Sequence, residues 1–123
     1  MMLGVAASAL VLSACLFGDG FNFQITDRRP AAVLESYPAW WSATEECSGE
    51  DGDLGRVQWY SALGITYDGV FAQGVWLPPH DIVILRGYEE HESTVRHEML
   101  HDLLEGDSEH EEAAWILCEL IDT

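Results

Sequence analysis

The segment His97-Glu98-Met99-Leu100-His101 constrains the fold of this chain more than any other part of its 123 residues. It lies in a stretch, 89–105, whose apolar residues recur at the spacing of one helix face. These residues are Val95, Met99, Leu100, Leu103 and Leu104. Ser93 or Thr94 stands where a helix begins and Gly106 where one ends, so the pattern predicts a helix over 89–105. Residues four apart on a helix lie one turn above each other, so both histidines are expected on one face.

Paired histidines with a glutamate between them are a pattern that binds zinc in hydrolytic enzymes. The rings of His97 and His101 can bind one ion, and Glu98 is the expected general base. The alternative is a core helix whose histidines are satisfied by hydrogen bonds to backbone or carboxylate oxygens. A lone histidine favours that alternative, whereas the pair with Glu98 between its members favours a metal site. Tyr88 and Arg96 are the nearest candidates for a group that stabilises an oxyanion.

His110 is the first candidate for a third metal ligand. The segment 108–121 is predicted to form a second helix, capped by Asp107 or Ser108 and acidic in its first turn. The apolar face of this predicted helix comprises Ala113, Ala114, Leu117, Cys118 and Ile121. His110 is expected to project from the same inward face, whereas Glu119 is expected to face solvent.

Asp107 and Glu111 remain alternative ligands, because carboxylates also bind zinc. Three protein ligands leave a fourth position for water, which distinguishes catalytic zinc sites from structural ones. His80 and His91 do not have ligand spacing and are expected at the surface.

With His110 and then Trp115 following it, the motif resembles SprT-like and WLM-type zinc proteases, small HExxH enzymes with a third histidine opening the next helix. The segment Arg96–His101 is also similar to one in compact bacterial lipoproteins. The resemblance covers about 76–118, and Leu104 stands where metzincins carry a glycine. It implies an α+β, zincin-like domain with an N-terminal helix, a short antiparallel sheet, the HExxH helix and a following ligand helix. It also implies a zinc-dependent peptidase, with a non-enzymatic zinc-binding lipoprotein as the alternative.

The segment between the ends is predicted to hold a helix and several short strands. The helix is expected over 31–47, interrupted near Pro38. Strands are predicted at 21–26, 56–60, 65–67, 70–71, 75–77 and 82–85, separated by glycine-rich turns. The strand Asp81–Leu85 precedes the HExxH helix and is a candidate sheet edge for an extended peptide, unless it is a paired central strand.

The first residues resemble a bacterial lipoprotein signal. The segment 1–16 is apolar, and Leu12-Ser13-Ala14-Cys15 resembles a lipobox, although no Lys or Arg precedes it. We therefore predict a signal peptide over 1–14, a lipidated Cys15 with a linker over 15–30, and a metallopeptidase domain over 31–123. The protein is expected in the bacterial cell envelope, attached to a membrane through its lipid anchor.

If Cys15 carries a lipid, two of the three cysteines remain, Cys47 and Cys118. An oxidising envelope compartment favours a disulfide between them, and the alternative is two buried thiols. Closing a loop of about 70 residues contributes on the order of 4 kcal/mol to the free energy of unfolding.

The net charge of -17, carried against five arginines and no lysine, excludes nucleic acid as a partner, because phosphates would be repelled. Acidic composition also follows from habitat or genomic base bias, so it does not identify the charge of a substrate. The expected partner is a peptide or protein substrate.

Overall fold

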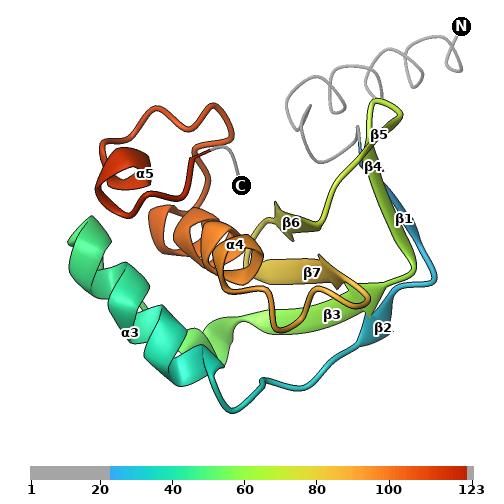
Figure 1. The fold of residues 1–123 in the computed structure, drawn as a ribbon, viewed down its shortest axis with the longest axis horizontal. Coiled ribbons are helices and arrows are strands. Elements are labelled where there is room, and N and C mark those ends of the chain that lie inside the picture. The colour runs from blue at the N-terminus through green and yellow to red at the C-terminus, as the bar shows by residue number, and fades with distance from the viewer. Residues whose placement is uncertain (1–22, 122–123) are drawn as a thin grey trace, which may run out of the picture.

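The structure is a computed structural model that describes residues 23–121 (Figure 1). The predicted signal peptide and the predicted lipidation site Cys15 lie outside the described residues. Within the described range, no helix has the length and apolar character needed to cross a membrane.

A four-stranded sheet forms the base of the domain, with strand order β2-β3-β7-β6. These strands are Arg29–Pro30 (β2), Gln58–Ala62 (β3), Asp81–Leu85 (β7) and Gly74–Leu77 (β6). β3 and β7 run parallel, whereas the two outer strands pair antiparallel. The α+β class is confirmed, but this larger sheet is mixed and not the antiparallel sheet that was predicted. The long connection between β3 and β7 returns the chain in the same direction, which a short hairpin cannot do.

A second, three-stranded antiparallel sheet projects from the first (Figure 1). It contains Phe23–Thr26 (β1), Gly64–Tyr67 (β4) and Val70–Phe71 (β5). Asp68 and Gly69 join β4 to β5 with φ angles of 51° and 80°, as the tight turns of hairpins require. The sheets share a small core of Ala62, Ile65, Val75 and Val83.

The main core lies between the four-stranded sheet and two helices, Tyr37–Ser48 (α3) and Glu92–Leu104 (α4). Its buried residues are Tyr37, Trp41, Val57, Trp59, Ile82, Ile84, Val95, Met99 and Leu103. The prediction that Pro38 interrupts a helix over 31–47 is wrong, since the helix begins next to it. Proline is tolerated in a first helical turn because its missing N–H has no partner there.

The predicted helix over 108–121 is largely absent. Only Ala114–Leu117 (α5) is helical, and Asp107 and His110 adopt left-handed φ angles of 63° and 58°. The Asp107 carboxylate accepts the backbone N–H groups of Glu111 and Glu112 at 3.1 and 3.0 Å, which stabilises this turn. The predicted apolar face is therefore only partly correct. Ala114 and Cys118 are buried, but Ala113, Leu117 and Ile121 are exposed, and the buried Trp115 and Leu120 were not part of it.

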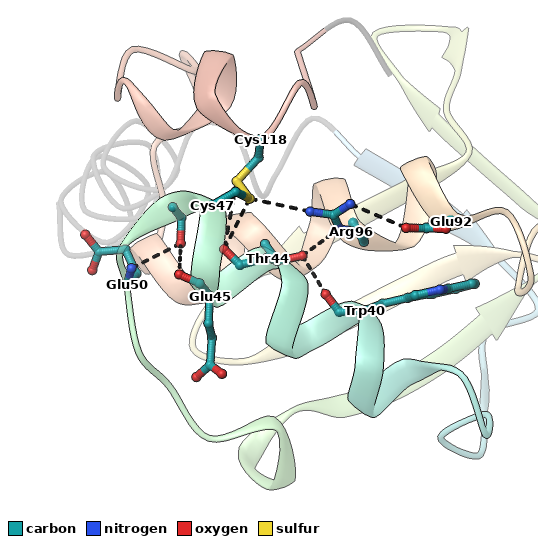
Figure 2. The surroundings of a disulfide bond; sticks show 9 residues. Trp40, Thr44, Glu45, Cys47, Glu50, Glu92, Arg96 and Cys118 are labelled. Atoms are coloured by element: carbon teal, nitrogen blue, oxygen red, sulfur yellow. Dashed lines mark hydrogen bonds and ion pairs between the residues drawn. A yellow bond between two sulfur atoms is a disulfide. The ribbon is translucent and has the colours of Figure 1, made fainter.

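The predicted disulfide joins Cys47 of α3 to Cys118, with 5.2 Å between their Cα atoms (Figure 2). Beside the bridge, the Arg96 guanidinium donates to the Thr44 hydroxyl at 2.8 Å and to the Cys47 sulfur at 3.4 Å. The disulfide thus connects α3 to the C-terminal segment that packs on α4.

Candidate metal centre

Three histidine rings meet at one point beside α4. His97 and His101 lie one turn apart on α4, and His110 comes from the turn that follows Gly106. The Nε2 atom of His110 lies 3.2 Å from Nε2 of His97 and 3.2 Å from Nε2 of His101. These are the only three residues within 23–121 that form such a candidate metal-binding group. The structure therefore brings together the three histidines that the sequence singles out.

Hydrogen bonds fix the rings of His97 and His101 so that the Nε2 lone pair of each ring faces Nε2 of His110. The Nδ1 atom of His97 lies 2.8 Å from the carbonyl oxygen of Leu120, and Nδ1 of His101 lies 2.8 Å from that of Gly106. A carbonyl oxygen only accepts, so in each neutral ring Nδ1 carries the hydrogen and Nε2 carries the lone pair. This tautomer is the one that a metal ion requires when it binds through Nε2.

The separation of the ring nitrogens matches a single ion. Tetrahedral zinc with nitrogen ligands at about 2.0–2.1 Å places neighbouring ligand atoms about 3.3–3.4 Å apart. The observed separation of 3.2 Å from His110 to each of the other two nitrogens is close to this value. A cation at the centre would also relieve the repulsion of lone pairs pointed at each other. The three residues can therefore hold one metal ion.

Burial keeps two of the rings neutral. Desolvation lowers the pKa of His97 to about 4 and that of His101 to about 4, and the nearby His110 acts in the same direction. Metal ions bind the neutral imidazole, so no proton competes for these two rings near neutral pH.

Trp115 packs against all three histidines. Its ring centroid lies 4.6 Å from that of His97, 4.6 Å from that of His101 and 4.5 Å from that of His110. The fully buried indole donates its Nε1–H to the Asp107 carboxylate at 2.7 Å. Asp107, which the sequence left open as an alternative ligand, thus fixes the turn and the tryptophan. Trp115 is a positioning residue whose only sequence signal is an aromatic five positions after His110.

Glu98 lies in the cavity beside the three histidines and is only 6% exposed. It faces Gly74 of β6, where an added Cβ would stand 3.1 Å from Glu98 Cγ and 3.2 Å from its Oε2. The absence of a side chain at Gly74 therefore makes room for the carboxylate.

The cavity has a volume of about 580 Å³, in the range of small-molecule and peptide sites. The three histidines and Glu98 line one part of it, and Gly74 and Trp76 of β6 border the same space. β6 pairs only with β7 in the four-stranded sheet, whereas β7 is paired on both sides. The suggestion that Asp81–Leu85 is the sheet edge is therefore wrong, and β6 is the edge strand next to the site.

Asp102 anchors the edge strand β6 through Trp76, a role that the sequence pattern did not predict. The fully buried carboxylate accepts from Trp76 Nε1 at 2.9 Å and Arg56 Nε at 3.2 Å, and lies 2.9 Å from Nδ1 of His80. His80 is half-buried rather than at the surface. The hydrogen bond that Trp76 donates to Asp102 fixes the indole, which stacks beside His101 at 6.4 Å between centroids.

Neither predicted oxyanion candidate lines the cavity. Arg96 points toward α3 and the disulfide (Figure 2), and Tyr88 packs edge-on against His91. Glu119 and His91 are exposed, as predicted.

Glu98 should make the stability of the metal-free protein depend on pH. Burial raises the pKa of Glu98 from 4.5 to about 8, so the folded state holds this proton more tightly than the unfolded state. The stability that the folded protein gains from the protonated Glu98 carboxyl is fully present below pH 4.5 and is lost as the pH rises through 8. Glu98→Gln should therefore stabilise the chelator-treated protein on the order of 5 kcal/mol above about pH 8, and little near pH 4. Urea unfolding at both pH values checks this.

The exposed Glu119→Gln variant is the matched control for the loss of one carboxylate and should not change the unfolding free energy at either pH. Equal unfolding free energies for Glu98→Gln and the parent chain at alkaline pH would contradict the prediction.

No family model, curated protein or solved structure matches this chain.

Proposed function

We propose that the chain is a zinc-dependent peptidase that hydrolyses peptide bonds with Glu98 as general base. The observation that carries the proposal is the convergence of the Nε2 atoms of His97, His101 and His110 in the cavity that also contains Glu98. Two helix residues and one turn residue supply three ligands, which leaves a coordination position for water or substrate.

Bound zinc would supply a water of lowered pKa and would polarise a substrate carbonyl. The residues of the protein transfer the protons and position the general base and the metal-binding rings. Glu98 accepts a proton from the attacking water at its carboxylate and returns it to the departing amine. Gly74 leaves space for this carboxylate, while the carbonyls of Leu120 and Gly106 hold the His97 and His101 rings in their ligand tautomer.

The edge strand β6 supports binding of an extended peptide. Its outer backbone groups have no strand partner within the described sheet, and its residues Gly74 and Trp76 line the cavity. A peptide added along this edge would be held by backbone hydrogen bonds, with its side chains alternating toward and away from the site. Its carbonyls would then pass close to Glu98.

We further propose that the protein acts in the bacterial cell envelope. The Cys47–Cys118 disulfide supports this location, because such bridges persist in oxidising compartments. The lipobox-like sequence before Cys15 supports a lipid anchor there.

A peptide-library digest of the purified full chain tests the peptidase function. Cleavage should occur with zinc present, stop when a chelator is added and return when zinc is restored. Bound zinc without cleavage of any peptide would instead indicate the non-enzymatic metal-binding alternative.

A further inference from the structure

One wall of the cavity is apolar and comes largely from the second sheet. The residues of this apolar wall are Phe23, Tyr67, Val70, Phe71, Ala72 and Val75. They line the same cavity as the three histidines and Glu98, so a molecule that fills the cavity at the metal centre would also contact the wall. The wall is therefore part of the site and not a separate surface patch.

Part of this wall is held firmly while another part is open to solvent. The rings of Phe23 and Tyr67 pack at 4.9 Å between centroids across the β1–β4 pair, which fixes their positions. Phe71 and Val70 of β5 are 81% and 68% exposed. Large exposed apolar side chains next to a cavity are typical of ligand sites, because covering them removes unfavourable contact with water.

The wall carries no charged side chain, whereas Asp107 and Glu109 border the cavity near the metal ligands. A charged group placed against the wall would lose hydration without gaining a partner. A large apolar side chain would instead cover Phe71 and Val70. The apolar wall thus favours a large apolar side chain of a bound molecule and disfavours a charged one.

Resting on the proposed peptidase function, we propose that the apolar wall is the specificity subsite, which selects peptides with a large apolar residue, such as Phe or Leu, next to the scissile bond. Burying a side chain of this size discriminates by about tenfold or more. Phe71 should contribute most to this selection, because its side chain has the largest exposed fraction of the wall for a substrate to cover.

The test uses quenched peptides that differ only at the residue next to the cleaved bond. The parent chain should cleave the Phe and Leu peptides with a kcat/KM about tenfold or more above that of the Ala and Asp peptides. Phe71→Ser should lower kcat/KM for the Phe and Leu peptides more than for the Ala peptide and so reduce this preference. Ile116→Ser is the matched control, since Ile116 is 71% exposed on α5 and does not line the cavity. An unchanged preference in Phe71→Ser would overturn the proposal.

A binding experiment separates this inference from the proposed activity. Acetohydroxamate and phenylpropionohydroxamate share a metal-binding group and differ by a benzyl arm, and their affinities can be measured on zinc-loaded Glu98→Gln protein. Tighter binding of the benzyl compound, lost in the added Phe71→Ser variant, supports the subsite even if no peptide is cleaved. Equal affinities for the two compounds would reject the subsite even if peptides are cleaved.

Discussion

Replacing Glu98 with glutamine should remove peptide hydrolysis while zinc remains bound. The amide has nearly the shape of the carboxylate but cannot accept the proton of the attacking water, and positioned general bases contribute about 10²–10⁴-fold to rates. Because the three ligand nitrogens belong to other residues, zinc affinity should change little. Steady-state cleavage and elemental analysis of the same preparation measure both quantities.

Two further variants sharpen this prediction. Gly74→Ala would place a Cβ within 3.2 Å of the Glu98 carboxylate and should reduce the rate without removing zinc. Gly64→Ala is its control, because the added atom would meet only Thr26 at 3.7 Å. Undiminished hydrolysis by Glu98→Gln in a preparation free of contaminating protease would show that another group accepts the proton.

Opening the disulfide should lower the free energy of unfolding by about 4 kcal/mol, because the bridge closes a long loop in the unfolded chain. Its cysteines are separated by 71 positions. The effect should reach the metal centre, because Cys118 shares one core cluster with Trp115 and Leu120. Those residues support the histidine rings, and α5 is too short to be stable alone. Zinc affinity should therefore fall together with stability.

Urea unfolding and zinc titration of a Cys47→Ser, Cys118→Ser double variant check both parts. Cys15→Ser is the matched control, since it removes the third cysteine and leaves the bridge intact. A double variant with unchanged zinc affinity would show that the C-terminal segment holds its position without the disulfide.

The histidine pair and its helix could be predicted from sequence because they depend on local periodicity. His97 and His101 are four apart on a helix that exists as expected, with bounds a few residues shorter at its start. The sequence correctly placed His110 near the other two histidines, but the helix from which it was expected to project is absent. His110 reaches the other rings from a left-handed turn that Asp107 stabilises, and not from a helix face.

The features that the sequence did not reveal depend on contacts between distant segments. Asp102 follows His101 on α4, but its partners Arg56 and Trp76 come from other parts of the chain, so helical spacing alone does not reveal these contacts. The parallel pairing of β3 with β7 is likewise nonlocal. The apolar run Ile82–Leu85, of which the first three residues are buried, did carry a usable signal, because a continuous apolar run indicates a strand covered on both faces. That signal argues against an edge position.

Calorimetric titration of zinc into the chelator-treated full chain tests most directly the central claim that His97, His101 and His110 bind one metal ion. The parent chain should bind one ion per molecule, and replacing His97, His101 or His110 with alanine should each weaken binding by more than about 100-fold, beyond the usual cost of losing an outer partner. His91→Ala, at an exposed histidine, should bind zinc like the parent. Unchanged binding after replacement of all three histidines, or no binding by the parent chain, would contradict the account.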